Sequence, residues 1–182
     1  MNLVELHDVG VAYDGYEALR HADLEIASDD FLGVIGPNGG GKTTLVKAIL
    51  GTVAHTGRID YAPELYRGKE RLIGYMPQQS DFDRAFPISV EEVVLSGLQG
   101  RRGFGKRYTG EDRKKASELL EKAGIAEAAR HPIGEVSGGQ MQRALLCRAV
   151  IAEPRLLILD EPANFVDNRF ENELYNLLRE LN

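Results

Sequence analysis

The feature that most constrains this chain is the segment of residues 36–44, which reads GPNGGGKTT. It matches the pattern G-x-x-x-x-G-K-[ST], in which a glycine-rich turn encloses phosphate groups. The apolar residues 31–35 before it predict a buried strand of a parallel sheet, and residues 43–50 after it predict a helix that ends at Gly51. Strand, glycine turn and helix follow one another in the order that a phosphate-binding loop requires.

The residue types of this segment suit a nucleoside triphosphate. Glycine allows the positive φ angles and the close approach that let several backbone N–H groups face one anion. The turn leads into a helix N-terminus, where unpaired N–H groups and the helix dipole favour negative charge. Lys42 is expected to contact the outer phosphates and the Thr43 hydroxyl to bind Mg²⁺. The predicted nucleotide-binding residues are Gly36, Pro37, Asn38, Gly39, Gly40, Gly41, Lys42, Thr43 and Thr44.

The length and composition of the chain argue against several classes of protein. A chain of 182 residues suffices for one domain with a sizeable core, and a net charge of −6 argues against a general affinity for nucleic acid or anionic membranes. No apolar run approaches the roughly 18 residues of a membrane span, and the N-terminus lacks the pattern of a signal peptide. The single cysteine, Cys147, excludes an internal disulfide framework and is expected to be a buried, inert thiol. We expect a cytoplasmic protein.

Further strands are predicted by short apolar or alternating segments at residues 3–9, 18–26, 57–61 and 72–76. The first two are expected to form an antiparallel pair. Tyr13, beside the turn between them, is either a packing residue or a surface on which a nucleotide base can stack. Gln78 follows the fourth strand and by itself indicates only an exposed loop.

Helical patterns dominate residues 80–136, which we interpret as an insertion between two strand-rich parts. Ser89 is expected to cap a helix that runs to about residue 98. Thr109, with an acid three residues later, is expected to cap a second helix, whose apolar face consists of Ala116, Leu119, Leu120 and Ala123. Residues 97–110 are rich in glycine and basic side chains, and form either a solvated loop or a basic patch for a partner or lipid headgroups.

A second helix start, at Ser137-Gly138-Gly139-Gln140, also has features of an anion site. Ser137 and Gln140 have the spacing of a capping box, which explains both residues without a ligand. Two successive glycines are harder to explain in this way, because each costs roughly 1 kcal/mol relative to alanine inside a helix. Close approach of a phosphate to the backbone would account for them.

The second decisive stretch is the aliphatic run of residues 156–159, followed by two acids. Four consecutive large aliphatic residues predict a strand buried on both faces. Asp160 lies at its carboxyl end, where α/β proteins bind ligands, and is expected on the Mg²⁺ side of the triphosphate. Glu161 is placed to orient or deprotonate the attacking water, and Asp167 is expected to cap a last helix.

These motifs together resemble the nucleotide-binding domain of ABC-type ATPases. The resemblance spans nearly the whole chain and includes the Walker A loop at 36–44, the signature at 137–140 and the Walker B strand at 156–160. It implies an α/β fold with a P-loop core of mostly parallel sheet flanked by helices, an N-terminal antiparallel part and an inserted helical lobe. We expect one domain, with residues 1–79 and 137–182 as the ATP-binding core and residues 80–136 as the lobe. Val136 stands where the family usually has leucine.

The resemblance also gives roles to isolated residues. Tyr13 matches the aromatic residue that stacks on adenine, and Gln78 the glutamine that senses the γ-phosphate and Mg²⁺. Glu161 matches the catalytic carboxylate, and Asp167 the aspartate that reaches the opposite subunit. The implied cofactors are ATP and Mg²⁺, with Thr43, Gln78 and Asp160 around the metal.

The family's geometry implies a head-to-tail homodimer, in which the signature of one copy meets the ATP bound by the other. It further implies an integral membrane permease that docks near residues 78–110, and an extracytoplasmic substrate-binding protein in the same system. The protein would then act at the cytoplasmic face of the membrane, with no nucleic-acid partner. The family normally continues to a switch histidine, which does not occur after the Walker B strand here, so we expect this chain to be truncated and only weakly active.

The segments MPQQ at 76–79 and FPISVEEVVLSG at 86–97 are similar to those of zinc and manganese uptake ATPases. The expected function is therefore ATP hydrolysis coupled to transmembrane transport, with metal-ion import favoured. Two alternatives remain: a soluble ABC ATPase of the cofactor-assembly type, and a nucleotide-sensing module that does not hydrolyse ATP.

Overall fold

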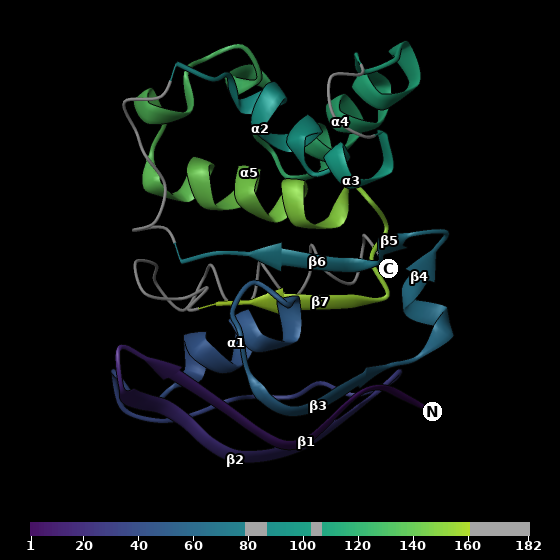
Figure 1. The fold of residues 1–182 in the computed structure, drawn as a ribbon. Helices are drawn as coiled ribbons and strands as arrows, with labels where there is room; N and C mark the ends of the chain where they lie inside the picture. The colour runs from purple at the N-terminus through teal and green to yellow at the C-terminus, as the bar shows by residue number, and fades with distance from the viewer. Residues whose placement is uncertain (79–86, 103–106, 161–182) are drawn as a thin grey trace. The chain divides into compact units, whose positions relative to one another are not determined.

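The structure is a computed structural model that describes residues 1–78, 87–102 and 107–160 (Figure 1). The chain divides into two compact units, Met1–Ile73 and Gly74–Asn182. Within the described residues, no helix is long and apolar enough to cross a membrane.

The first unit is built on an antiparallel sheet of three strands in the order β2-β1-β3. Strands β1 (Asn2–Tyr13) and β2 (Tyr16–Ala27) form the predicted pair, and β3 (Thr56–Tyr61) adds to the other edge of β1. Asp14 and Gly15 make the tight turn of the hairpin, with φ angles of 48° and 84°. One face of the sheet supplies the buried side chains Val4, Leu6, Val9, Val11 and Ile26.

Helix α1 (Lys42–Leu50) contacts β1 and β2, and the Tyr61 hydroxyl donates a 2.8 Å hydrogen bond to the Ile49 carbonyl near the end of the helix. The helix ends at Gly51 in the left-handed conformation, as the sequence predicted. A short turn, η1 (Pro63–Leu65), and the small ladder of β4 (Tyr66–Arg67) and β5 (Glu70–Arg71) complete this unit.

The prediction of a buried strand at residues 31–35 is wrong for this structure. The segment has no strand conformation, and Ile35 and Phe31 are 96% and 79% exposed. A strand exists only through hydrogen bonds to neighbours, and none of the described sheets pairs with this segment. Its apolar composition indicated the capacity for burial but not a partner.

The second unit combines a two-stranded sheet with helices. The strands β6 (Ile73–Met76) and β7 (Leu156–Leu159) run in the same direction (Figure 1). The helices are α2 (Val90–Ser96), α3 (Gln99–Arg102), α4 (Gly110–Lys122) and α5 (Gly138–Val150), with short turns η3 (Ala126–Ala128) and η4 (Ile133–Glu135). Each residue of β7 is half-buried, so the predicted burial on both faces is not reached in the described structure.

The core of the second unit lies between α2, α4 and α5, whose mutual contacts hold the helical layer together. The predicted face of α4 is buried, from Ala116 to Ala123. Ser89 and Thr109 cap α2 and α4, as predicted, and each forms a complete capping box, with Glu92 and Asp112 respectively. Helix α3, within the segment that the sequence predicted as a loop, was missed.

Candidate nucleotide-binding site

The loop before α1 has a shape that only glycine tolerates at its close contacts. Gly41 has φ +86°, and a Cβ atom there would lie 2.6 Å from the Ala18 carbonyl oxygen. A Cβ at Gly40 would lie 2.9 Å from the Pro37 carbonyl oxygen, which accepts a 3.0 Å bond from the Gly40 N–H. The chain therefore folds back on itself at residues 37–41, directly before the helix N-terminus.

Lys42 is the first residue of α1, and its side chain turns back over this loop. Its Nζ donates 2.9 Å hydrogen bonds to the carbonyl oxygens of Gly36 and Pro37. The N-cap residue, Gly41, provides no side-chain cap, and the first turn of the helix contains no acidic residue. The ammonium group, the helix N-terminus and the absence of a neighbouring carboxylate in that turn make a surface suited to an anion. Thr43 and Thr44 follow in the same turn, half-buried.

Tyr13 lies at the end of β1, opposite Tyr16 on β2. The two rings are 41% and 68% exposed, so both can contact a planar ligand. Sequence reasoning identified Tyr13 and missed Tyr16. The turn between the two tyrosines was the sequence signal for this pairing, because a two-residue turn places its flanking residues opposite each other in the hairpin.

Asp160 and Gln78 belong to the second unit and follow two parallel strands. The Asp160 N–H donates a 3.0 Å bond to the Met76 carbonyl, which holds the start of the segment after β7 against the end of β6. The Asp160 side chain is 6% exposed, and its Oδ2 atom lies 3.5 Å from the Tyr75 hydroxyl. Gln78, half-buried, lies two residues beyond β6. Because β6 and β7 are neighbouring parallel strands, Gln78 and Asp160 both follow the same edge of this sheet.

These residues offer oxygen donors, which are the ligands that Mg²⁺ prefers. A Mg²⁺ ion at a nucleotide site needs only one or two carboxylates, because the phosphates supply further oxygens. In the described part of the chain, no group of three or more His, Cys, Asp or Glu side chains could hold a metal ion by itself. The buried carboxylate of Asp160 therefore fits a metal that arrives with a phosphate ligand.

The turn at Ser137 is an exposed helix start. The Ser137 Oγ accepts a bond from the Gln140 N–H over 3.2 Å, and the Ser137 N–H donates to the Gln140 Oε1 over 3.0 Å. Ser137 and Gly138 are exposed, and a Cβ atom at Gly139 would meet none of the described atoms within 4 Å. The capping box accounts for Ser137 and Gln140, whereas no packing contact within the described chain requires glycine at 139.

Glu161 and Asp167 lie outside the described residues. The loop at 36–44 and Tyr13 belong to the first unit, while Gln78, Asp160 and the turn at 137–140 belong to the second.

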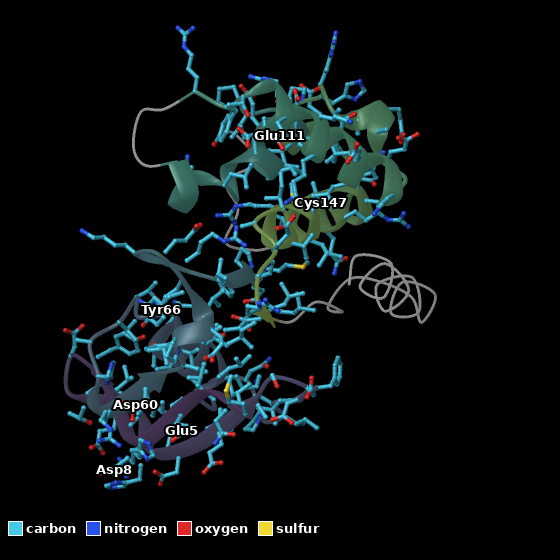
Figure 2. All side chains as sticks on the ribbon, turned by 90° about the vertical axis from the view of Figure 1, so that its right-hand side faces the viewer. Glu5, Asp8, Asp60, Tyr66, Glu111 and Cys147 are labelled. Atoms are coloured by element: carbon cyan, nitrogen blue, oxygen red, sulfur yellow. The ribbon has the colours of Figure 1, made fainter. Side chains whose placement is uncertain are left out.

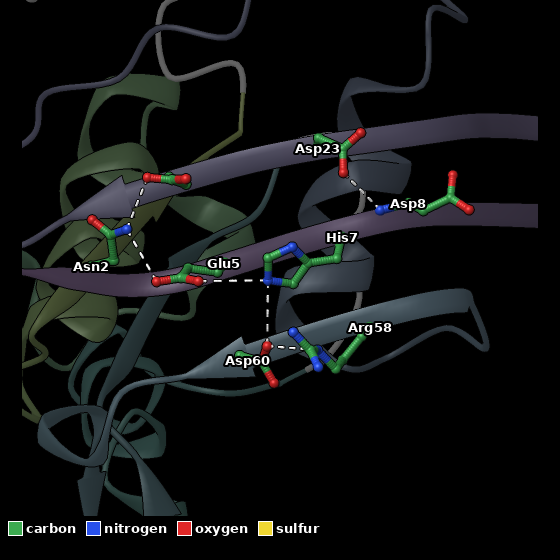
Figure 3. Close-up of polar contacts among 8 residues, drawn as sticks. Asn2, Glu5, His7, Asp8, Asp23, Arg58 and Asp60 are labelled. Carbon is green, nitrogen blue, oxygen red and sulfur yellow. Dashed lines mark hydrogen bonds and ion pairs between the residues drawn. The ribbon is translucent and has the colours of Figure 1, made fainter.

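Two other groups with reactive side chains do not form a site. On the sheet of the first unit, His7 Nε2 lies 3.5 Å from Glu5 Oε2 and 3.4 Å from Asp60 Oδ2, and Asp60 also pairs with Arg58 (Figure 3). These ion pairs are solvent-exposed and contribute little stability. Cys147 is buried on α5 (Figure 2), and burial raises its pKa to about 12, so it is an inert thiol as predicted.

The family model described as ABC transporter matches residues 19–164. The chain belongs to this family. It is 36% identical over 179 residues to the manganese transport system ATP-binding protein MntB of Halalkalibacterium halodurans, covering 98% of this chain and 72% of that protein. It is 41% identical over 180 residues to the zinc import ATP-binding protein ZnuC of Pseudomonas putida, covering 98% of this chain and 63% of that protein. The chain thus spans less than two thirds of the length of this zinc relative.

Solved structures of ABC proteins share the fold. A metal-chelate type ABC transporter in an inward-facing conformation has a TM-score of 0.81 at 28% identity, covering 99% of this chain and 68% of that chain. A nucleotide-free ATP-binding cassette of an ABC transporter has a TM-score of 0.79 at 24% identity, covering all of this chain and 77% of that chain. The predicted fold class, a P-loop ATPase of the ABC type, is confirmed.

Proposed function

We propose that this ABC family chain is the ATP-binding subunit of a metal-ion importer and hydrolyses ATP to drive uptake of zinc or manganese. The observation that carries the ATPase assignment is the glycine turn with Lys42 folded over it at an uncapped helix start. The metal cargo is supported by the two relatives, which are named as manganese and zinc transport proteins. A soluble ABC ATPase of the cofactor-assembly type is the alternative that these relatives do not favour.

In this function the chain's own residues divide into three groups. The backbone of 36–41 and the Lys42 ammonium bind the phosphates, and Tyr13 stacks on the base. Thr43, Gln78 and Asp160 supply oxygen ligands for Mg²⁺, which neutralises negative charge on the phosphates when bound. Glu161 orients the attacking water and accepts its proton.

Two copies of the chain complete the site. The Ser137–Gln140 turn of one copy contacts the γ-phosphate held by the loop of the other, and Asp167 reaches across the same interface. The exposure of Ser137 and Gly138 and the open space at Gly139 support this arrangement, because a partner can approach the turn without rearrangement. ATP then favours the closed dimer over the open one through its contacts to both copies.

The remaining proposed partners are those that metal-ion import requires. An integral membrane permease docks near residues 78–110, at the cytoplasmic face of the membrane, and an extracytoplasmic binding protein delivers the metal ion. Closure of the dimer is thereby coupled to opening of the membrane pathway.

Three variants of the full-length protein test this function, two of them at the same helix. Lys42→Ala is expected to abolish binding of Mg-ATP, whereas Lys47→Ala, an exposed lysine in the last turn of α1, leaves it unchanged. Glu161→Gln is expected to bind Mg-ATP and form stable dimers without turnover. Equal ATP affinity in Lys42→Ala and Lys47→Ala would contradict the nucleotide site.

Transport is tested separately. The full-length protein, reconstituted in vesicles with the membrane subunit that co-purifies with it, is expected to take up zinc or manganese only when ATP is supplied. An ATPase that co-purifies with no membrane protein, and whose turnover no metal ion stimulates, would favour the cofactor-assembly type instead.

A further inference from the structure

Helices α2 and α5 of the second unit meet through a polar contact that the proposed ATP chemistry does not use. The Arg148 Nε donates a 3.0 Å hydrogen bond to the Ser96 Oγ, which itself donates a 2.6 Å bond to the Val93 carbonyl. Ser96 is the last residue of α2, and Arg148 lies in the last turn of α5. The guanidinium group thus joins the C-terminal turns of the two helices, which we name the Arg148–Ser96 contact.

The backbones also approach closely at this point. A Cβ atom at Gly97, directly after α2, would lie 2.1 Å from the Arg148 carbonyl oxygen and 2.7 Å from Ile151 Cγ2. Real Cβ atoms do not approach other atoms this closely, so any side chain at 97 would separate the helices. Arg148 therefore contacts the end of α2 both through its backbone, at Gly97, and through its side chain, at Ser96.

Arg148 is charged and only half exposed, which costs desolvation free energy. Burial lowers the pKa of its guanidinium, and the neighbouring Tyr75 opposes this shift. The Tyr75 hydroxyl is also the group that lies 3.5 Å from Asp160 Oδ2. Tyr75 on β6 is thus in contact with the carboxylate at the end of β7.

We propose that Arg148 is a positioning residue that fixes α2 to α5, so that α2 moves together with the Ser137–Gln140 turn at the other end of α5. This inference rests on the proposed function, in which the turn meets ATP bound to a second copy and the region of α2 meets the membrane subunit. Closure of the dimer around ATP would then displace the docking region through the Arg148–Ser96 contact.

Two substitutions at Ser96 distinguish the loss of its hydroxyl from any other change of this side chain. Ser96→Thr keeps the hydroxyl that accepts from Arg148, whereas Ser96→Ala removes it. Arg148→Gln removes the donor from the other side. Cysteines placed at Glu91 on α2 and Glu135 beside the signature turn carry spin labels, and the buried Cys147 does not compete for the label.

The full-length protein is expected to give a single narrow distribution of label distances, unchanged in Ser96→Thr. In Ser96→Ala and Arg148→Gln the distribution is expected to widen at least twofold, while basal ATP hydrolysis and KM for ATP stay within twofold of the parent. In the complex with the co-purified membrane subunit, stimulation of ATP hydrolysis by that subunit is expected to fall at least fivefold in these two variants alone.

Unchanged distance distributions in Ser96→Ala and Arg148→Gln would overturn the proposal. It would also be overturned if these variants lost melting temperature, ATP affinity and stimulation together, because the contact would then support only the fold. A protein that binds no ATP would refute the proposed function, but the distributions recorded without nucleotide would still decide whether Arg148 fixes the two helices.

Discussion

The starts of helices α1 and α5 present the same backbone groups in two different ways. Helix α5 begins with a complete capping box, in which Ser137 and Gln140 satisfy backbone N–H groups of their own turn. Helix α1 has Gly41 as its N-cap residue, which has no side chain to cap the helix. The first helix therefore has no side-chain cap at its N-terminus, whereas the second is capped by its own serine and glutamine and has two glycines in the same turn.

The comparison suggests a test for ligand binding at a helix start. One asks which of its residues stabilise the helix when no ligand is bound. At α1 the strained glycines and the lysine have no benefit to the isolated helix. At α5 the serine and the glutamine stabilise the helix start without a ligand, whereas Gly139 does not. Substitutions at the two helix starts should therefore differ in how they change the stability of the fold and the affinity for a ligand.

Among the glycine and cap substitutions at the two helix starts, the largest effect is expected for Gly41→Ala. Alanine at φ +86° is strained by about 1–3 kcal/mol, and its Cβ would lie 2.6 Å from the Ala18 carbonyl, so the loop must change shape. We expect ATP affinity, measured by calorimetry, to fall by roughly 100-fold, which is about 2.7 kcal/mol.

The control for Gly41→Ala is Gly68→Ala, which has a similar strain at φ +65°, but whose Cβ atom would meet none of the described atoms within 4 Å. It should lower the melting temperature without lowering ATP affinity. Equal losses of affinity in both variants would show that general destabilisation, not the shape of the loop, governs binding.

Gly139→Asp should separate binding from stability at α5. An acidic side chain in the first turn of a helix stabilises it by about 0.3–1 kcal/mol, so the melting temperature should stay the same or rise. The same carboxylate would repel the γ-phosphate held by a second copy. We expect ATP-dependent dimerisation, measured by light scattering, to weaken at least tenfold, by roughly 1.4 kcal/mol or more.

Gly110→Asp is the matched control, because Gly110 is the first residue of α4 and a Cβ atom there meets none of the described atoms within 4 Å. It should leave dimerisation unchanged and raise the melting temperature less, because Glu111 and Asp112 already lie in the first turn of α4. If Gly139→Asp dimerises normally, the turn at α5 is only a capped helix start.

A smaller effect is expected when the caps themselves are removed. Ser137→Ala and Ser89→Ala each delete the hydroxyl of a capping box, which is worth about 1 kcal/mol, or about 2–4 °C in melting temperature. Both should lower stability equally, but only Ser137→Ala should also slow ATP hydrolysis. Equal ATPase rates in the two variants would remove Ser137 from the proposed site.

What the sequence could predict depended on how far apart the interacting residues are in the chain. The caps at Ser89, Thr109 and Ser137 bond to residues three positions later, and all three were predicted from residues that lie close together in the sequence. Residues 31–35 were predicted as a strand because apolar residues favour one, but a strand also needs a neighbour, which no local pattern specifies.

The same holds for the candidate site: contacts between residues close in the sequence were predicted, and contacts between distant residues were not. The loop at 36–44 is contiguous, so its residues were predicted together. The approach of Tyr75 to Asp160 joins residues 85 positions apart, and the bond from Arg148 to Ser96 joins residues 52 positions apart. Both arise from the packing of strands and helices that are distant in the sequence, and both were missed.

The smallest expected effect is the change that Mg-ATP causes in the interior of α5, which is followed through Cys147. Burial raises the pKa of Cys147 to about 12, and only the thiolate reacts with alkylating reagents. At pH 8 the folded protein should therefore react on the order of a thousandfold more slowly than an exposed cysteine of pKa roughly 8.5. Because the folded-state pKa is raised, this thiol leaves stability unaffected below about pH 8.5 and lowers it progressively up to about pH 12.

Labelling of Cys147 also checks the comparison between the two helix starts. Since the capping box stabilises α5 without a ligand, Mg-ATP should leave the slow labelling rate of the parent almost unchanged, whereas Ser137→Ala should raise the rate by weakening the helix. The rates can be followed by mass spectrometry at pH 8. Fast labelling of the parent that Mg-ATP suppresses would mean that α5, like α1, depends on a ligand for its order, and the distinction between the two helix starts would be wrong.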